Sequence, residues 1–463
     1  MRAKLLKIPL AILFLYFIFI LIATTLLIKS PVKNEVNLNQ IPSYAIKEQH
    51  FDQAQLLEDG FTSGQARLKI IEEAKKTIHI AYYKFYEEET TDLMIGAMFK
   101  AADRGVNVRF MLDAMTNYLN RDLKRALAAH PNIELKVYEP FHPLRPGTWQ
   151  NRLHDKLLIV DEQFVITGGR NLGDKYLAES KMDNFVLDRD VLLYRPNIED
   201  SSVIQHIDQY FHTLWDSPFS KQYKPKLSEK DKTKETKREY MTYYDEMNTF
   251  QTVFSNPEFD WDKYTIKVDQ TRFLANPIER GKKEPIIFTG LNELFKQAQS
   301  SIQIQTPYVI PTKEMKSHTA ILPNSEVETD IITNSLNSTP NMLAFSGYLN
   351  KKGELIKEAN RVYEYEGAFS VHGKSILIDD YTSVIGSFNF DSRSTFINTE
   401  SIVIIEGKEF AEMLQLAFDD IIKESHLVSE NGIMNEPAPT KSAGKELFLN
   451  ILSKLTVPIQ SLL

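Results

Sequence analysis

A short motif that occurs twice constrains the fold of this 463-residue chain more than any other feature. The first copy spans His154–Asp161 and the second spans His372–Asp379, and both have the pattern H-x-K-x4-D. Six residues later each copy enters a glycine-containing turn that ends in asparagine, at 168–171 and at 386–389. One such pattern arises easily by chance, whereas two copies with the same internal spacing indicate a duplicated structural unit.

The similarity between the two halves extends beyond the motif, because predicted elements follow in the same order at a nearly constant offset. The matched segments are helices at 66–76 and 291–299, strands at 77–83 and 301–308, strands at 106–112 and 327–333, and segments at 135–139 and 359–364. Strands that alternate with helices predict, in each half, a mostly parallel sheet between layers of helices. The apolar runs Leu157–Val160 and Ile376–Ile378 are typical of strands buried on both faces. The fold class is therefore α/β, with two tandem α/β/α sandwich domains.

The segments outside the repeat set the expected domain boundaries. We expect an N-terminal anchor at 1–30, a tether at 31–50, a first domain at 51–220, a charged linker at 221–275, a second domain at 276–430 and a C-terminal tail at 431–463. Residues 221–238 include eight basic and three acidic side chains, which favours a solvated linker or exposed helix over a basic patch that faces anionic lipid. Apolar residues at helical spacing in the tail favour packing onto the body over insertion into a membrane interface. These residues are Leu447, Phe448, Ile451, Leu452 and Leu455.

An uncharged run near the N-terminus, Ile8–Ile28, is long enough to span a bilayer. The apolar region of a secretory signal is shorter, and no small-residue cleavage pattern follows the run, so an uncleaved single-pass transmembrane helix is favoured over a cleaved signal. Arg2, Lys4 and Lys7 precede the run, which predicts a cytoplasmic N-terminus and a body on the outer side of the cell membrane. The absence of cysteine is compatible with export.

The charge of the chain argues against nucleic acid as a partner. The net charge is −8, and because residues 1–30 contribute +4 without any acid, the remaining chain carries −12. Domains that hold nucleic acid are normally basic, since phosphate neutralisation supplies most of their affinity.

Within each motif the histidine and the lysine lie two residues apart, so on an extended strand both point to the same face. The motif aspartates, Asp161 and Asp379, lie at an odd offset and point away, which favours a structural role at the turn. The glycine-containing turns, with Gly169 and Ser387 at equivalent positions, bring backbone N–H groups and an asparagine back toward the His-Lys face. The predicted catalytic residues are His154, Lys156, Asn171, His372, Lys374 and Asn389.

Two histidines, two lysines and two asparagines form a cationic pocket suited to a phosphodiester. Lysine and asparagine can donate hydrogen bonds to phosphate oxygens and stabilise a pentavalent transition state. One imidazole can attack phosphorus while the other protonates the leaving oxygen, and water or an alcohol can then attack the phosphohistidine. Asp190 and Glu400, each at the start of an apolar strand, are candidates to orient the histidines. The pattern contains neither cysteine nor carboxylates at metal-ligand spacing, so we expect no metal and no cofactor.

Two further segments are candidates for the walls of the site. His79, on a predicted strand beside Tyr82 and Tyr83, suits a pocket wall and a satisfied core position equally well. The loop Phe141–Trp149 precedes the first motif and contains proline and aromatic residues, so it is a candidate shield for an acyl chain or head group.

The duplicated motif resembles the signature of the phospholipase D superfamily, and the resemblance covers nearly the whole chain after the N-terminal run. The segments Gly168–Asp174 and Gly386–Glu400 are similar to the bacterial cardiolipin synthase branch. The resemblance implies two phospholipase D-like domains that share one active site on a pseudo-twofold axis and work through a phosphohistidine without a metal. It also implies that His154 is the nucleophile and His372 the general acid, although the two copies are alike enough for the order to be reversed. Many members of that branch have two N-terminal spans, whereas this chain has one such run.

The function that the sequence favours is a membrane phospholipid phosphatidyltransferase of the cardiolipin synthase type. Its expected partners are membrane phospholipids, namely phosphatidylglycerol and phosphatidylethanolamine. One alternative is a phospholipase D that releases phosphatidic acid. A nuclease of the same superfamily is disfavoured by the anchor and the acidic body, and an inactive scaffold is disfavoured by the two intact motifs.

Overall fold

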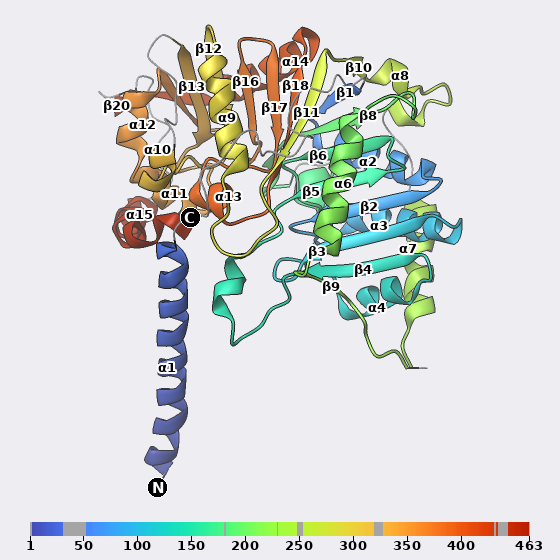
Figure 1. Ribbon diagram of the computed structural model, residues 1–463, viewed down its shortest axis with the longest axis horizontal. Coiled ribbons are helices and arrows are strands. Elements are labelled where there is room, and N and C mark those ends of the chain that lie inside the picture. Colours follow the sequence, from blue (N-terminus) through green and yellow to red (C-terminus); the bar gives the residue numbers. More distant parts are fainter. Residues whose placement is uncertain are drawn as a thin grey trace.

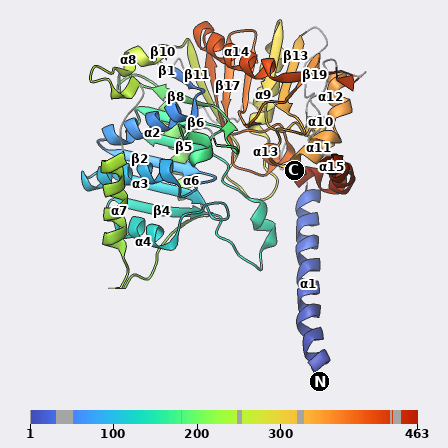
Figure 2. The ribbon, with the colours of Figure 1, turned by 180° about the vertical axis from the view of Figure 1, so that it is seen from behind.

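The computed structural model describes residues 2–30, 52–179, 182–228, 230–247, 253–318, 327–429, 432–433 and 443–462. The predicted tether at 31–50 lies outside this part of the chain. Within the described part, each half of the chain forms a nine-stranded sheet, and the two sheets lie next to each other (Figure 1, and from behind in Figure 2).

The two sheets have the same internal order. The first sheet has the order β10-β1-β8-β6-β5-β2-β3-β4-β9, and the second has the order β11-β18-β17-β16-β12-β13-β14-β19-β20. The strands of the first sheet are β1 (Gln53–Leu57), β2 (Thr77–Tyr82), β3 (Asn107–Asp113), β4 (Ile133–Tyr138), β5 (Lys156–Val160), β6 (Phe164–Gly168), β8 (Asp190–Tyr194), β9 (Ser220–Gln222) and β10 (Ile266–Lys267). The strands of the second sheet are β11 (Gln270–Ala275), β12 (Ser301–Gln305), β13 (Glu328–Asn334), β14 (Arg361–Tyr365), β16 (Ser375–Ile378), β17 (Thr382–Gly386), β18 (Ser401–Glu406), β19 (Ser425–Ser429) and β20 (Gly432–Ile433). When β1 is matched with β11, the strands that follow correspond one to one, which confirms the predicted duplication.

The prediction of a mostly parallel sheet is wrong. In the first sheet β2 pairs in parallel with β3, and β3 with β4, whereas the pairings from β2 through β5, β6 and β8 to β1 are antiparallel. The reason is the connection between the motif strands, because β5 and β6 are joined by a three-residue turn rather than by a crossover helix. Asp161 and Glu162 in that turn have positive φ angles of 56° and 53°. The motif is therefore a β-hairpin at the centre of each sheet.

In each half, helices cover the sheet face that points away from the other half, and further helices pack between the two halves. The helices of the first half are α2 (Gly60–Glu73), α3 (Glu89–Asp103), α4 (Arg121–Ala129), α5 (Asp174–Leu177), α6 (Val203–Asp216), α7 (Thr233–Met247) and α8 (Trp261–Tyr264), with 3-10 turns η3 (Pro146–Gln150) and η4 (Val253–Ser255). The helices of the second half are α9 (Ile286–Gln297), α10 (Lys313–His318), α11 (Met342–Leu349), α12 (Lys352–Glu358), α13 (Ser392–Phe396), α14 (Lys408–Lys423) and α15 (Ala443–Thr456), followed by the 3-10 turn η5 (Val457–Leu462).

An apolar core shared by both halves fixes the two sheets against each other. Val165 and Val191 of the first sheet and Ile385 and Val403 of the second sheet belong to one buried cluster, together with Phe211 of α6. Each of these side chains is fully excluded from water. Burial of a side chain of this size stabilises the folded state by about 1.5–3 kcal/mol. The relative position of the two motifs is therefore set by hydrophobic packing between the halves.

The motif aspartates hold the helix-to-strand turn at the far end of each hairpin. The Asp161 carboxylate accepts the backbone N–H groups of Lys75, Lys76 and Thr77 at 2.7–2.8 Å. Asp379 does the same for the three residues 299–301 at 2.7–3.0 Å. The prediction that these two aspartates point away from the His-Lys face is confirmed.

Two segments outside the repeat differ from the predictions in detail. The charged segment after residue 220 includes the strand β9 and the helix α7, and Tyr240 and Tyr244 of α7 are buried in the core of the first half. In the tail, α15 packs onto the second half through Leu449 and Leu452. The other members of the predicted apolar stripe lie on the exposed face of α15, so the helix packs with a different face from the one that the sequence pattern indicated. These exposed residues are Leu447, Phe448, Ile451 and Leu455.

The helix α1 (Arg2–Lys29) extends away from the body (Figure 1). It touches the first half through Tyr16, whose hydroxyl donates to the carbonyl oxygen of Pro143 at 2.8 Å. Among the helices that the structure describes, none combines the length and the apolar character required to cross a membrane. The predicted transmembrane anchor at Ile8–Ile28 is therefore not supported.

The turn aspartates can be tested by substitution. Asp161→Asn places an amide nitrogen against a backbone N–H group and removes the charge, so we expect it to lower the free energy of unfolding by about 1–3 kcal/mol. Urea denaturation followed by circular dichroism measures this change. The matched control is Glu162→Gln on the same turn, where the side chain is exposed and a change within about 0.5 kcal/mol is expected. Equal stability of the two variants would contradict the role given to Asp161.

Candidate active site

The two motif histidines lie where the halves meet, and backbone contacts between the halves fix both. His154 lies two residues before β5, and its N–H donates to the carbonyl oxygen of Thr399 in the second half at 3.2 Å. His372 lies three residues before β16, and its N–H donates to the carbonyl oxygen of Leu187 in the first half at 2.7 Å. The short parallel strands β7 (Val186–Leu187) and β15 (Ser370–Val371) add a second link beside His372. Each histidine is therefore held by backbone from the opposite half.

The side chains of the two histidines are oriented by carboxylates that also come from the opposite half. Nδ1 of His154 lies 2.9 Å from Oε2 of Glu400, and Nδ1 of His372 lies 2.6 Å from Oδ2 of Asp188. Both carboxylates are buried. A carboxylate on Nδ1 leaves Nε2 of each ring for chemistry and fixes the ring orientation. Neither half supplies both members of either of these two pairs, so the arrangement requires both halves.

The prediction that Asp190 orients a histidine is wrong. Asp190 accepts hydrogen bonds from Ser63 at 2.9 Å and from Arg67 at 2.8 Å, inside the first half. Asp188, two residues earlier, is the residue that contacts His372. Sheet register could have revealed it, because Gly168 pairs with Asp190 and the equivalent glycine of the second half pairs with Ile402. Counting back two residues from each partner gives Asp188 and Glu400 as the matched positions.

The second position of each glycine-containing turn lies against one of these carboxylates. A Cβ atom on Gly169 would lie 2.0 Å from Oδ1 of Asp188, so only glycine fits there. At the equivalent position, the Ser387 hydroxyl donates to Oε2 of Glu400 at 2.5 Å. Glycine therefore makes room for one carboxylate, and serine binds the other.

The motif lysines point back along their own strands toward the histidines. Nζ of Lys156 donates to the carbonyl oxygen of His154 at 2.6 Å, and Nζ of Lys374 lies 2.9 Å from Nδ1 of His372. Burial lowers the pKa of Lys156 to about 8 and that of Lys374 to about 7, although nearby carboxylates act in the opposite direction. A bound phosphate would place negative charge beside these buried ammonium groups and so stabilise their charged form.

The two predicted asparagines lie in the same buried region. Nδ2 of Asn171 donates to the Tyr176 hydroxyl at 3.2 Å. In the part of the chain that the structure describes, Oδ1 of Asn171 and Oδ1 of Asn389 are buried without a hydrogen-bond partner. Buried polar groups are rarely left unpaired, so these amides are suited to bind an added ligand.

The electrostatic surroundings of the two histidines differ. Burial and the nearby charges of Lys156, Lys374, Arg393 and Lys84 hold the pKa of His154 well below its usual value. Burial and Lys374 lower the pKa of His372 to about 3, whereas the Asp188 carboxylate acts to raise it. The pKa of Asp188 is lowered from its usual value by His372 and Lys374, against the effect of burial, so this group is an anion. Burial raises the pKa of Glu400. The two rings therefore differ because the Asp188 anion acts to raise the pKa of His372, whereas the cations near His154 act to lower its pKa.

Tyrosines and an arginine complete the walls, and sequence reasoning did not identify their roles. The Tyr83 ring lies 4.8 Å from the His154 ring, and the Tyr176 ring lies 6.1 Å from the His372 ring. Arg393 donates to Oε1 of Gln150 at 2.7 Å, and Gln150 directly follows the predicted shielding loop. Tyr83 lies one position past β2 and Tyr176 lies five positions past Asn171, and no repeated spacing marks either residue, so these positions are found only from the structure.

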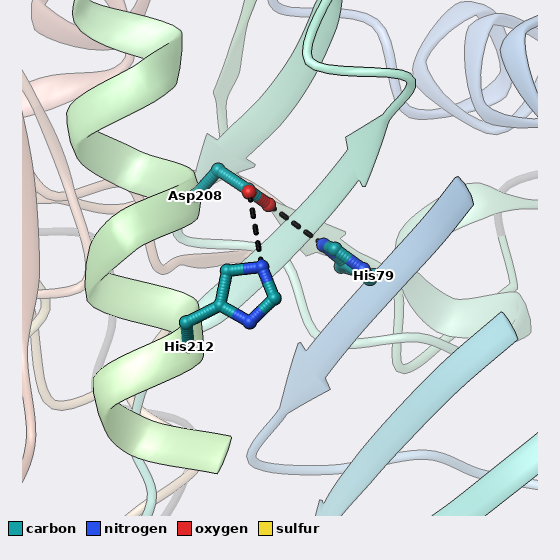
Figure 3. Close-up of side chains that lie close together, drawn as sticks. All are labelled: His79, Asp208 and His212. Atoms are coloured by element: carbon teal, nitrogen blue, oxygen red, sulfur yellow. Dashed lines mark hydrogen bonds and ion pairs between the residues drawn. The ribbon is translucent and has the colours of Figure 1, made fainter. Parts of the chain in front are cut away.

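His79 does not line this site. It lies on β2 and faces α6, where Nδ1 is 2.6 Å from Oδ1 of Asp208 and His212 is 3.3 Å from Oδ2 of the same residue (Figure 3). Within the described residues this is a group that could offer three metal-ligand atoms, all within 4.8 Å of one another. Arg109 lies 3.0 Å from Nδ1 of His212, so the three side chains already form a hydrogen-bonded network. The network joins α6 to the sheet, apart from the motif histidines.

The fold and the paired motifs define a duplicated enzyme fold with one site between two related domains. A family model described as "Cardiolipin synthase, PLD-like domain" matches residues 68–215 and 291–422. The chain belongs to this family of phospholipase D-like proteins.

Individual relatives agree with the family match. An uncharacterized protein of Helicobacter pylori strain J99 is 30% identical over 414 residues, which is 81% of this chain and 80% of that protein. Cardiolipin synthase C of Escherichia coli K12 is 28% identical over 396 residues, which is 78% of this chain and 83% of that enzyme. The crystal structure of phosphatidylserine synthase from Haemophilus influenzae Rd KW20 superimposes with a TM-score of 0.62 at 14% identity, covering 96% of this chain and 100% of that one. The last comparison shows a shared fold.

The crossed carboxylates make a prediction that separates orientation from folding. Asp188→Asn and Glu400→Gln should each lower kcat for phosphatidyl transfer by about 100-fold or more, because the ring loses its fixed tautomer and orientation. Asp190→Asn is the matched control, since it breaks a buried ion pair with Arg67 and should lower the melting temperature instead. Melting curves and initial rates are measured for all three variants. A kcat near wild type for either Asp188→Asn or Glu400→Gln would contradict the assigned pairing.

The motif lysines predict how the reaction depends on pH. A lysine binds phosphate in its charged form, which exists below its pKa and is lost as the pH rises through it. With pKa values of about 7 for Lys374 and about 8 for Lys156, kcat/KM should fall as the pH rises across this window. Lys374→Arg stays charged and should move the alkaline fall to higher pH, whatever its effect on the maximal rate. An alkaline limb at the same pH in Lys374→Arg would show that this lysine does not control it.

Proposed function

We propose that the protein transfers a phosphatidyl group between phospholipids through a phosphohistidine intermediate, in the manner of a cardiolipin synthase. The observation that carries the proposal is the crossed pairing of His154 with Glu400 and of His372 with Asp188. It leaves two imidazole Nε2 atoms available in one buried cationic site, as a double displacement at phosphorus requires.

In the first step, Nε2 of His154 attacks the phosphorus atom of the donor lipid. An N–P bond forms, the P–O bond to the donor head group breaks, and the leaving oxygen takes a proton from Nε2 of His372. The positive charges of Lys156 and Lys374 stabilise the oxygens of the pentavalent transition state, and Asn171 and Asn389 supply further hydrogen bonds.

In the second step, an alcohol takes the place of the departed head group. Nε2 of His372 removes the proton of the alcohol, the alcohol oxygen attacks phosphorus, and the N–P bond to His154 breaks. Both histidines return to their starting states, so no co-reactant is consumed. A catalytic dyad of this kind alternates between acid and base roles without a metal or cofactor.

The assignment of His154 as the nucleophile rests on the different surroundings of the two rings. His154 is surrounded by cations, which keep its ring neutral and its lone pair available. His372 faces the Asp188 anion, which stabilises the imidazolium form that a general acid needs. In the protein alone, burial and Lys374 lower the pKa of His372 to about 3, and the negative charge of a bound phosphodiester acts with Asp188 to raise it toward that role.

Exposed apolar side chains near the site support a lipid substrate. Phe141 and Leu144 of the loop before η3 are exposed, as are Leu447 and Phe448 on α15. The loop, α1 and α15 lie on the same side of the molecule in both ribbon views (Figures 1 and 2). A surface of this character, on a chain with an acidic body, suits the surface of a lipid bilayer better than a nucleic acid. Phosphatidylglycerol and phosphatidylethanolamine are the proposed lipid partners.

The proposal is tested with detergent-solubilised protein and defined lipids. Phosphatidylglycerol is supplied alone or with phosphatidylethanolamine, in the presence of excess chelator, and products are identified by mass spectrometry. We expect cardiolipin to accumulate under both conditions. His154→Ala and His372→Ala should each lose about 1,000-fold or more of the rate, because the two groups act as one unit.

The outcomes of this experiment distinguish the alternatives. Lys124→Gln on α4 is the control, since this half-buried lysine lies outside the site. Phosphatidic acid as the sole product would make the protein a hydrolase. No lipid turnover together with cleavage of DNA would overturn the proposal, and loss of activity in chelator that a divalent ion restores would overturn the metal-free mechanism.

A further inference from the structure

A second pair of lysines, Lys84 and Lys175, lies beside the motif lysines and donates no proton or hydrogen bond in the two proposed chemical steps. Lys84 follows β2, and Lys175 is on α5, directly after the turn that carries Asn171. The two segments are joined by backbone hydrogen bonds, because Leu172 N–H donates to the Lys84 carbonyl oxygen at 3.2 Å and its own carbonyl accepts the Tyr86 N–H at 2.9 Å. The two ammonium groups are close enough for the charge of Lys175 to lower the pKa of Lys84, in addition to the effect of burial.

Each of these lysines is separated from a catalytic histidine by one aromatic ring. Nζ of Lys84 lies 5.4 Å from the centre of the Tyr83 ring, which contacts His154. Nζ of Lys175 lies 5.2 Å from the centre of the Tyr176 ring, which faces His372. The charge of Lys84 is also among those that lower the pKa of His154. The lysine pair is therefore adjacent to the reacting centre but displaced from it.

The positive charge of this pair is only weakly compensated by the protein. Neither lysine forms a salt bridge among the residues that the structure describes, and both are half-buried. Among carboxylates, Glu88 acts most to raise the pKa of Lys175. Glu88 already accepts the Asp174 N–H at 2.7 Å at the start of α5. Lys175 itself donates to the Tyr86 hydroxyl at 3.3 Å. Two neighbouring cations that form no salt bridge with the protein destabilise the folded state unless an anion binds between them.

We propose that Lys84 and Lys175 bind the phosphate of the acceptor molecule, whose hydroxyl group attacks the phosphohistidine. This inference rests on the proposed transfer reaction. An acceptor that carries a phosphate on the far carbon of a glycerol places its free hydroxyl at His154 while its own phosphate lies at a second site. The motif lysines bind the phosphate that is transferred, and the second pair binds the phosphate that is not. The pair thus selects an anionic glycerol phosphate over water or a neutral alcohol.

The test compares acceptors at a fixed donor, labelled phosphatidylethanolamine, by initial rates in mixed micelles. The acceptors are phosphatidylglycerol, soluble glycerol 3-phosphate and uncharged glycerol. In the variant with both Lys84→Gln and Lys175→Gln, the ratio of kcat/KM for phosphatidylglycerol to that for glycerol should fall about tenfold or more, because charge-assisted hydrogen bonds to the acceptor are lost. Lys84→Arg with Lys175→Arg should keep most of the preference.

The acceptors and the control variant separate the sources of any effect. A parallel fall for glycerol 3-phosphate shows that the pair recognises the phosphate itself, whereas a fall for phosphatidylglycerol alone shows that it recognises the phosphate of a lipid. Lys124→Gln should leave the ratio unchanged. An equal loss for all three acceptors would overturn the proposal, because the pair would then act on the chemical step rather than on acceptor choice. Failure of the proposed function would appear in the wild-type protein, as transfer to none of the acceptors.

Discussion

The whole site depends on two hydrogen bonds that cross between the halves of the chain, from His154 to Glu400 and from His372 to Asp188. Both carboxylates are buried, and a buried charge is tolerated only when it has a partner. Separation of the halves would remove the imidazole partner of each carboxylate and the carboxylate partner of each imidazole. The hydrophobic core that joins the sheets and the polar network of the site therefore stabilise the same arrangement. The duplicated sequence makes one active site because each copy supplies only one member of each histidine–carboxylate pair.

The pseudo-symmetry of the fold is broken where the chemistry needs a difference. Gly169 leaves room for Asp188, whereas Ser387 at the matched position donates a hydrogen bond to Glu400. Ser394 and Asn398 donate to the other oxygen of Glu400. Asp188 instead relies on its histidine and on the Arg189 backbone N–H. The second pair of lysines, with Lys84 and Lys175, lies in the first half and adds a further asymmetry around the site.

The sequence predicted the features that depend on local spacing. The duplication, the buried strand residues of both motifs and the outward turn aspartates all follow from periodicity that one strand or turn already determines. It failed where the outcome depends on which strands become neighbours. Parallel pairing was expected from the alternation of helices and strands, but the short turn at Asp161 makes the motif strands antiparallel. Asp190 was predicted in place of Asp188 because the choice between the two aspartates depends on sheet register. The pairing of each histidine with a carboxylate of the other half could not be predicted, because it depends on how the two domains dock.

Motif spacing also could not predict which side chains from other helices and strands approach the site. Tyr83, Tyr176 and Arg393 carry no repeated pattern, and their proximity to the histidines arises from tertiary packing. For His79 the sequence left two readings open, and the structure supports the satisfied core position, because the side chain faces α6 (Figure 3). His79 lies within β2, whereas Tyr83 follows the end of that strand, so their positions along the strand decide which of them reaches the site.

The most direct measurement is to identify the residue that carries the phosphatidyl group during turnover. Labelled phospholipid is mixed with the protein, the reaction is quenched within one turnover, and the modified peptide is mapped by mass spectrometry under conditions that preserve phosphohistidine. The proposed roles of the two rings predict the label on His154 and not on His372, because the Asp188 anion acts to raise the pKa of His372 and so favours its role as the acid. Label on His372, or full turnover with label on neither histidine, would contradict the account.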